Sequence, residues 1–170
     1  MTVSMYQAAV PPLVRLLETL KHLLAKGEAH AAARQIEPSV LLGARLALDM
    51  LPLARQVQMV SDSAKGAGAR LAGAALPSYP DTETSFPELQ ARLDKTIAFL
   101  KGLDEAAFAG AAEREVKMKA GASEYTFTGL DYLQTFALPN AFFHAVTAYN
   151  ILRHNGVEVG KMDYLTGGRA

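Results

Sequence analysis

The chain has 170 residues, half of them apolar and a fifth charged, which suits one globular domain with a substantial hydrophobic core. Lys and Arg together number 17, as do Asp and Glu, so the formal net charge is zero. A surface that binds nucleic acid normally carries a basic excess, and we therefore expect no nucleic-acid partner. The absence of cysteine excludes disulfides, thiolate metal sites and cysteine nucleophiles.

The sequence shows no signal for targeting or for division into several domains. Residues 1–6 lack the basic region and apolar run of a signal peptide, and no apolar segment reaches the roughly 20 residues that cross a bilayer. No linker, internal repeat or low-complexity tract interrupts the chain. We therefore expect a cytoplasmic protein without a membrane partner, folded as one domain over residues 1–170.

An amphipathic helix is predicted over residues 6–26. Its apolar residues recur at spacings of three and four, at Val10, Leu13, Leu16, Leu17, Leu20, Leu23 and Leu24. Pro11 and Pro12 mark the start of the regular helix or a kink near that start. Gly27 is its expected end.

A second helix is predicted from Pro52 to about Leu71, and a long polar loop over residues 73–85 follows it. This helix contains small residues that would let a neighbouring helix approach closely: Ala64, Gly66, Ala67, Gly68 and Ala69. Ser85 and Glu88 then have the spacing of a capping box. This spacing predicts a third helix over about 86–103, with apolar residues at helical intervals (Leu89, Leu93, Ile97 and Leu100).

The periodicity changes after the third helix. Residues 115–120 and 124–128 alternate between polar and apolar side chains, and a turn that contains Gly121 separates them. This pattern predicts a β-hairpin, the only strand signal in the chain.

The last long helix is predicted between Pro139 and Gly156, because proline suits a first helical turn and Asn-Gly suits a helix end. Residues 129–138 form a short helical stretch. Pro139 either kinks this stretch into the last helix or separates the two. The apolar residues of the tail, 157–170, predict that it packs back onto the body.

Several motifs along nearly the whole chain resemble an uncharacterised bacterial and fungal family, a domain of unknown function, within the DinB/YfiT-like superfamily. They are the Met-Tyr start, Asp49-Met50-Leu51-Pro52-Leu53, Gln56-Val57-Gln58, Asp81-Thr82-Glu83-Thr84-Ser85-Phe86, Leu138-Pro139-Asn140, Phe143-His144, and Tyr149 with Leu152-Arg153-His154-Asn155-Gly156. The resemblance implies an all-α, up-down-down-up four-helix bundle with a small β-hairpin between helices three and four. Superfamily members are frequently dimeric, so a homodimer is implied as well.

The resemblance also bears on metal binding, because many superfamily members hold a divalent ion through three histidines between the helices. Only His144 has a counterpart among those ligands. The last helix of such proteins usually carries His-x-x-x-His, whereas Ala148 follows His144 by four positions. No histidine occurs from Gly43 to Gly73, where the second-helix ligand would lie. We therefore expect no metal ion and no other cofactor, with His144 as the one weak candidate ligand.

His144 is the central candidate for a site. It lies among apolar residues and is either a hydrogen-bonded core histidine or part of the lining of an internal pocket. Gln58 and Asp62 are four apart and share a helix face. They either complete a polar pocket with His144 or serve as ordinary surface and backbone-bonding groups. Tyr149, Asn140 and Tyr6 are further candidates to line the same cavity.

The other three histidines have simpler interpretations. His154 fits the C-terminal end of the last helix, where the helix dipole favours positive charge. His22 and His30 are expected to be solvated.

Three hypotheses follow. The first is a DinB-like bundle that has lost its metal site and binds an unknown small molecule around His144. The second is a metal-dependent hydrolase or thiol transferase that uses a divalent ion such as zinc or nickel, held by His144 with Gln58 and Asp62. The third is an interaction protein whose small-residue second helix forms the dimer interface. Whether the protein is an enzyme stays open at this point.

Overall fold

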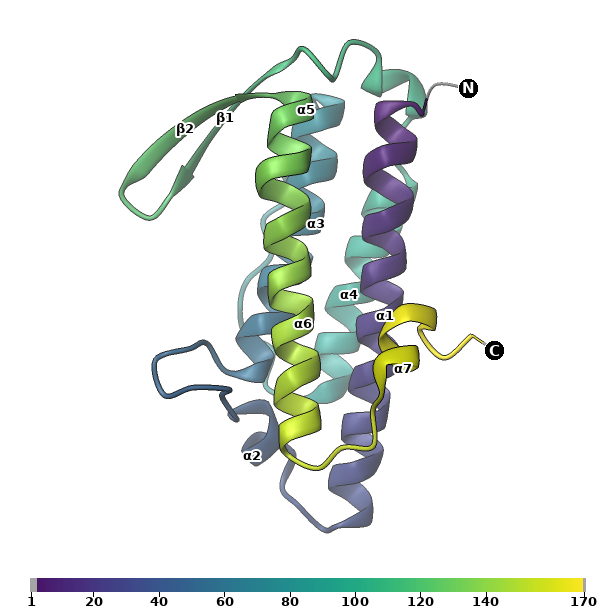
Figure 1. Ribbon diagram of the computed structural model, residues 1–170, viewed down its shortest axis with the longest axis vertical. Coiled ribbons are helices and arrows are strands. Elements are labelled where there is room, and N and C mark those ends of the chain that lie inside the picture. Colours follow the sequence, from purple (N-terminus) through teal and green to yellow (C-terminus); the bar gives the residue numbers. More distant parts are fainter. Residues whose placement is uncertain (1–2, 170) are drawn as a thin grey trace.

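The computed structural model describes residues 3–169, which form a mostly helical protein with one two-stranded hairpin (Figure 1). The elements in chain order are α1 (Met5–Ala33), α2 (Pro38–Leu42), α3 (Leu53–Ala72), α4 (Phe86–Lys101), the 3₁₀ helix η1 (Glu105–Phe108), β1 (Glu115–Ala120), β2 (Ser123–Thr128), α5 (Gly129–Asp131), the π-helical turn η2 (Tyr132–Ala137), α6 (Leu138–His154) and α7 (Lys161–Thr166). Within this part of the chain, no helix is both long and apolar enough to cross a membrane.

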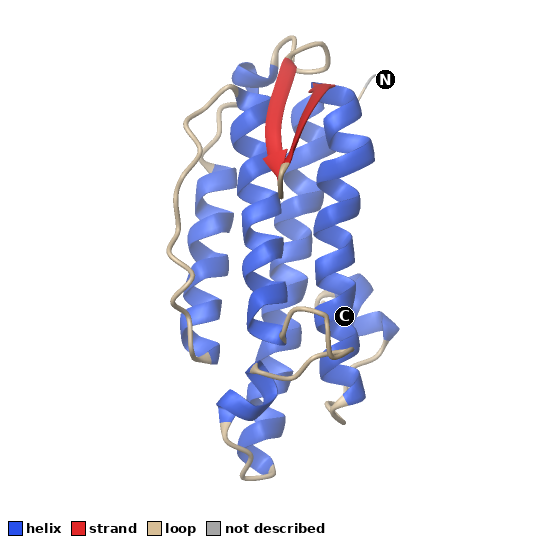
Figure 2. Ribbon diagram, turned by 90° about the vertical axis from the view of Figure 1, so that its left-hand side faces the viewer, coloured by secondary structure: helices blue, strands red, loops and turns tan. Residues whose placement is uncertain are grey.

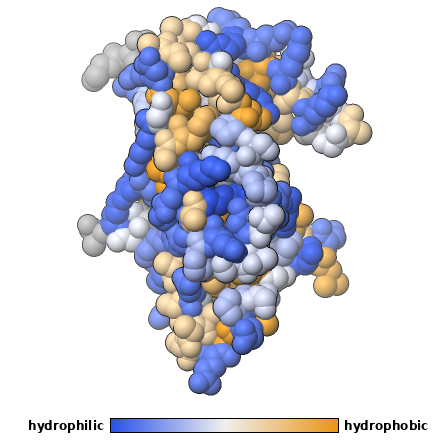
Figure 3. Space-filling view, turned by 180° about the vertical axis from the view of Figure 1, so that it is seen from behind, coloured by the Kyte–Doolittle hydropathy of each residue, from blue (hydrophilic) through white to orange (hydrophobic). Residues whose placement is uncertain are grey.

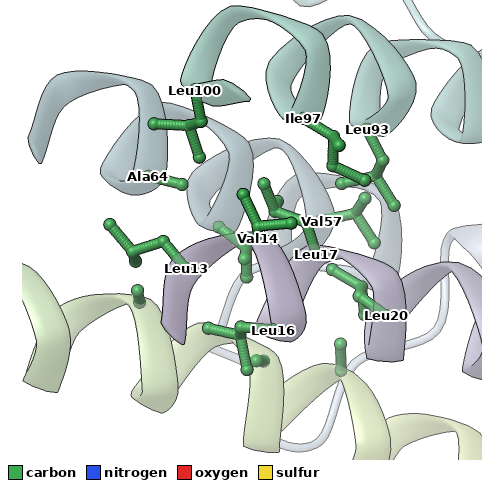
Figure 4. Packing of buried hydrophobic residues seen from close by; sticks show 14 of the residues in the cluster. Leu13, Val14, Leu16, Leu17, Leu20, Val57, Ala64, Leu93, Ile97 and Leu100 are labelled. Carbon is green, nitrogen blue, oxygen red and sulfur yellow. The ribbon is translucent and has the colours of Figure 1, made fainter. Parts of the chain in front are cut away.

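The four long helices, α1, α3, α4 and α6, pack side by side around one hydrophobic core (Figures 1 and 4). Leucine and valine side chains of α1 point toward α3 and α4, so that Leu17, Val57 and Leu93 meet in the centre. All three are fully buried. The apolar spacing that predicts the helices therefore also identifies the faces that they bury.

α1 is longer than predicted at both ends. It begins at Met5, because Ser4 and Gln7 form a capping box, so Pro11 and Pro12 lie within the helix. The expected end at Gly27 is wrong, since α1 continues to Ala33. Gly27 is buried against α6, and a Cβ atom there would lie only 2.9 Å from a methyl carbon of Leu152. The glycine thus allows α6 to approach α1 and does not end the helix.

α3 agrees with the predicted helix, and its small residues lie against other parts of the same chain. All of them are buried within the single chain. A Cβ atom on Gly68 would lie 2.5 Å from Leu100 and 2.9 Å from Leu103. Gly68 therefore lets α4 and the chain after it approach α3, as the sequence predicts. Because all five small residues are buried in the single chain, they leave no small-residue surface on α3 for a dimer.

Residues 74–85 form a strap that has no regular secondary structure and runs along the length of the molecule between α3 and α4 (Figure 2). Gly73 ends α3 in the left-handed conformation, with a φ of 66°. Ser85 and Glu88 form the predicted capping box and start α4. The face that carries α4 shows a mainly hydrophilic belt across its middle, between more apolar regions toward the two ends (Figure 3).

The predicted hairpin is confirmed. β1 and β2 pair antiparallel, with Val116 opposite Phe127 and Met118 opposite Tyr125, and Gly121 occupies the turn with a φ of 61°. The hairpin projects away from the helices (Figure 1). Phe127 contacts an aromatic cluster that includes Tyr132 and Phe136 of η2.

Pro139 does not separate two helices, because the helical segment continues through it. α5, η2 and α6 follow one another without a gap and form one helical rod (Figure 1). The π-helical turn η2 lies directly before the proline, and such turns widen the backbone hydrogen-bond spacing inside a helix. The missing N–H of Pro139 is therefore accommodated next to a segment whose hydrogen bonds are already irregular.

The C-terminal segment packs back onto the body, as predicted. Val157 and Val159 are buried, and α7 lies against α1. His22 Nε2 is 2.8 Å from a carboxylate oxygen of Asp163, and Lys26 donates to the same oxygen at 3.0 Å. His22, which the sequence predicts to be solvated, is therefore partly exposed and also has a partner, because α7 brings a carboxylate to it from far along the chain.

Candidate functional site

α3 presents polar side chains on two opposite sides. Positions 56 and 58 are two residues apart and therefore about 200° apart around the helix. Gln56 and Ser63, seven positions apart, both face α6. Gln58 and Asp62 face α4 and the strap. The polar residues that the sequence predicts for one pocket are thus divided between two places.

On the α6 side, His144 is a buried, hydrogen-bonded histidine. Its Nδ1 lies 2.7 Å from Gln56 Oε1. The Gln56 amide nitrogen donates to the carbonyl oxygen of Leu51 at 3.0 Å, which turns the amide oxygen toward the imidazole. His144 Nδ1 must therefore carry the proton and donate it.

The environment of His144 keeps its ring neutral. Burial lowers the pKa of the imidazole below its ordinary value of 6.5. The second nitrogen, Nε2, accepts no hydrogen bond from residues 3–169, and no side-chain nitrogen or oxygen without a partner is fully buried among them. Nε2 thus has an open lone pair that reaches solvent.

The residues around His144 do not fit the three-histidine metal site of the superfamily. The position one turn later is Ala148, which has no donor atom, and the facing residue of α3 is the amide of Gln56. In the part of the chain that the structure describes, no three His, Asp or Glu side chains converge as metal ligands. Such an ion needs about four donors, and His144 offers one.

On the opposite side of α3, a buried guanidinium organises a network of charges. Arg92 of α4 is only 4% exposed. It donates to Asp62 at 2.8 Å and to Glu83 at 3.0 Å, and its third acidic partner is Asp81, also at 3.0 Å. It also donates to the hydroxyl of Ser61 (3.2 Å). Arg92 thus joins α3, α4 and the strap through charge-assisted hydrogen bonds.

Further contacts fix the strap to the same surface. Arg55 donates to Asp81, and Gln58 donates to Glu83 at 2.8 Å. The ring of Tyr79 contacts two ammonium groups, since the Nζ atoms of Lys65 and Lys95 are each 4.2 Å from its centroid. These contacts hold the strap against α3 and α4 although it has no secondary structure of its own.

Beside this network lies a cavity of about 390 Å³ between α3, the hairpin and the start of α6, which we call the α3 groove. Aromatic and thioether side chains provide most of its apolar wall, and Asp62, Ser63 and Asn140 provide polar groups. The groove is lined by Met59, Asp62, Ser63, Arg70, Met118, Lys119, Gly121, Tyr132, Phe136, Ala137 and Asn140. An apolar lining with a few convergent polar groups is typical of small-molecule sites.

The polar groups of the groove have defined hydrogen bonds and free capacity. Asn140 donates its amide hydrogen to Ser63 Oγ at 2.7 Å, and Ser63 donates to the carbonyl oxygen of Met59 at 2.7 Å. Asp62 uses one oxygen, Oδ1, for both Lys65 (2.7 Å) and Arg92. The second oxygen of Asp62 is therefore free to accept a hydrogen bond from a ligand.

The structure brings two of the predicted site residues, Asp62 and Asn140, to the α3 groove, and the others lie elsewhere. His144 is bonded to Gln56, and Gln58 belongs to the strap contacts. The other two predicted residues are the tyrosines. Tyr149 packs against Tyr164 of α7, and Tyr6 packs edge-on against Phe108 of η1.

Arg92 and Arg70 are the important residues that the sequence analysis does not identify. Arg92 occupies a position on α4 that its neighbours Leu89 and Leu93 mark as close to the buried face. A charged residue beside an apolar stripe indicates a buried ion pair only if acidic residues lie close to it. The acidic residues here belong to the strap, and the sequence does not show that the strap runs beside α4. Arg70 carries no such signal, because it resembles an ordinary last-turn arginine.

Comparison with known proteins supplies the family. The model of a domain of unknown function, DUF1993, matches residues 5–165. A crystal structure of a DinB family member protein from Shewanella denitrificans has 40% sequence identity and a TM-score of 0.88, and the match covers 95% of this chain and 91% of that chain. A search of curated proteins found no match. The chain therefore belongs to the DUF1993 family and has the fold of a DinB family member.

Proposed function

We propose that this protein is a small-molecule-binding member of the DinB-like proteins, and that the α3 groove is its binding site. Its four long helices would then form the up-down-down-up bundle of that superfamily, with α2, α5 and α7 as additions. The observation that carries the proposal is the groove itself, where apolar walls and the free oxygen of Asp62 meet in one cavity.

The proposal places the ligand in the α3 groove and not around His144. His144 has only Nε2 left for a ligand, whereas the groove combines unused hydrogen-bonding capacity at Asp62 and Asn140 with apolar walls in one cavity. In this proposal His144 is the remnant of a metal site and serves to orient α6 against α3.

A fragment screen monitored by ¹⁵N NMR tests the binding site. We expect binding fragments to shift the amide signals of residues 59–63 and 132–140. The variant Asn140→Leu should abolish these shifts, because it removes the amide and fills the groove. Asn150→Leu, a half-buried asparagine later on the same helix, is the matched control and should leave them unchanged. If fragments bind only elsewhere, the proposal is wrong.

Elemental analysis tests the lost metal site. We expect zinc and nickel in substoichiometric amounts in protein purified without chelator. One tightly held ion per chain that disappears in His144→Ala would instead support the alternative, a metal-dependent hydrolase or thiol transferase of the DinB/YfiT type.

A further inference from the structure

We infer that the α3 groove takes an organic carboxylate, and that Arg70 and Tyr132 hold its carboxylate group. The inference rests on the proposed function and specifies the ligand class of that site. Arg70 lines the α3 groove and two adjoining cavities. One of these, about 470 Å³, lies under the hairpin, and the other, about 380 Å³, lies under the strap.

The guanidinium of Arg70 is held in place without an acidic partner. The cations nearby on α3 are paired, Arg55 with Asp81 and Lys65 with Asp62. Among residues 3–169, no carboxylate pairs with Arg70. Its one side-chain hydrogen bond goes to the hydroxyl of Tyr132, at 3.2 Å. A half-buried guanidinium that faces a cavity with most of its donors free is suited to an incoming anion.

Arg70 does not have the usual role of a cation in the last turn of a helix. Its Nη1 lies over Gly66, one turn toward the start of α3, where a Cβ atom would be 2.5 Å away. The guanidinium therefore points away from the final carbonyl groups of α3. Arg114 takes that role and donates to the carbonyl oxygen of Leu71. Gly66 thus provides the space that directs Arg70 into the groove.

Tyr132 supplies the second donor. Its side chain is 2% exposed, and burial raises the pKa of its phenol, while the charge of Arg70 opposes the increase. The phenol therefore keeps its proton at neutral pH. Because its oxygen accepts from Arg70, its own hydrogen is free for a ligand oxygen. A guanidinium and a phenol side by side suit a carboxylate.

The surroundings favour a flat apolar body carrying a single negative charge. The rings of Tyr132 and Phe136 are nearly parallel, at 16°, with centroids 6.2 Å apart, and Phe136 and Met59 line the groove. The nearby Lys119 already pairs with Glu124 at 3.1 Å, which leaves one uncompensated cation. One cation matches a monocarboxylate better than a phosphate dianion.

Titrations with three probes, followed by NMR, test the inference. Benzoate and benzamide have the same shape and differ in charge, and inorganic phosphate is the third probe. We expect benzoate to shift groove amides and to bind at least about tenfold more tightly than benzamide, since hydrogen bonds to charged groups are the stronger kind. Phosphate should bind more weakly than benzoate. Equal affinity for benzoate and benzamide, or stronger binding of phosphate, would overturn the carboxylate assignment.

Variants assign the effect to Arg70. Arg70→Gln should lower the affinity for benzoate about tenfold and leave that for benzamide unchanged. Gly66→Ala keeps the charge of Arg70 but displaces its guanidinium, and it should lower the affinity for benzoate in the same way. Arg153→Gln removes an exposed arginine at the far end of α6 and is the control. If benzamide binds the groove and neither variant affects benzoate, the inference fails while the proposed function stands. If neither these probes nor the screened fragments shift groove amides, both fail.

Discussion

At the scale of single residues, the orientation of one amide determines the chemistry of His144. Because Gln56 donates to Leu51, its oxygen faces the imidazole and fixes the tautomer with the proton on Nδ1. A protonated imidazole could keep this hydrogen bond, yet it would carry its charge in a buried position, which burial disfavours. The residue is therefore a neutral structural donor near neutral pH.

This arrangement predicts a pH dependence of stability. The pKa of His144 is lower in the folded chain than its ordinary value of 6.5, so the unfolded chain binds more protons between these two pKa values. The free energy of unfolding should therefore fall as the pH decreases below 6.5. His144→Asn retains a donor for Gln56 but does not titrate. Urea unfolding between pH 7 and pH 5 should show a flatter dependence for this variant than for the wild type.

His154→Asn is the matched control, because His154 lies on the same helix and is exposed. Its pH dependence should equal that of the wild type. A wild-type slope that survives unchanged in His144→Asn would show that other groups cause it.

At the scale of elements, charge and not apolar burial holds the strap. None of residues 74–85 is buried, and the contacts of Asp81 and Glu83 with Arg92 hold the strap instead. Burial alone would raise the pKa of Asp81. The hydrogen bond and charge of Arg55, with the charge of Arg92, lower it below its usual range.

Loss of the buried guanidinium should therefore be costly. Arg92→Met leaves Asp62, Asp81 and Glu83 without their shared cation, and we expect it to lower the free energy of unfolding by about 3–5 kcal/mol. Lys101→Met, which breaks an exposed pair with Glu18, should cost less than about 1 kcal/mol. Urea denaturation measures both, and hydrogen exchange should show faster exchange in the strap of any folded Arg92→Met. Similar costs for the two variants would contradict the argument.

The contact between α7 and α1 predicts a second, acidic pH dependence. Hydrogen bonds from His22 and from the Gly160 N–H, with a further contribution from Lys26, lower the pKa of Asp163 far below its ordinary value of 3.8. The stability that Asp163 contributes is therefore complete above pH 3.8 and is lost as the pH falls below it.

Asp163→Asn should cost roughly 1–3 kcal/mol at pH 7, because it replaces charged hydrogen bonds with neutral ones. The difference in thermal unfolding between wild type and variant should shrink as the pH decreases toward 3. A difference that stays constant over this range would show that Asp163 acts through shape and not through charge.

At the scale of the whole molecule, the small residues of α3 are used inside the chain, so a homodimer needs another surface. We propose that the exposed apolar face of α6 forms it. Phe142, Phe143 and Val146 lie within five residues of α6 and are 40%, 56% and 40% exposed. A chain without net charge also does not repel a second copy. A two-fold axis would bring the same face of both copies together.

Light scattering on a size-exclusion column tests this proposal. The wild type should have the mass of two chains at tens of micromolar, and Phe143→Glu should have the mass of one. Leu48→Glu changes a fully exposed leucine in the loop before α3 and should leave the dimer intact. A monomeric wild type would rule out the proposed dimer.

The sequence predicts the helices and the hairpin well because local spacing carries their signal. α3 and α4 begin and end close to the expected residues, and β1 and β2 have the expected alternation. Gly27 is misread, since a glycine that permits close packing has the same local signature as one that ends a helix. Which partner packs there is long-range information that the spacing does not contain.

The site is predicted less well for a related reason. Asp62 and Asn140 line one cavity, but His144 lies outside it. Gln58 points to the side of α3 opposite Gln56, because two residues turn a helix by about 200°. The roles of Arg92 and Arg70 depend on the path of the strap and on the space above Gly66. The residues next to Arg92 and Arg70 in the sequence indicate neither the path of the strap nor this space.

The π-helical turn η2 has a consequence for the aromatic wall. It fits an extra residue into the rod, since its hydrogen bonds span five positions where those of an α-helix span four. If the residues of η2 took α-helical spacing instead, with none deleted, Tyr132 would rotate by about 100° relative to α6. The phenol of Tyr132 would then lose its hydrogen bond with Arg70, and Phe127 of the hairpin would lose its aromatic contacts with Tyr132 and Phe136. The wide spacing of η2 therefore sets the phase between the two halves of the rod, and with it the shape of the cavity.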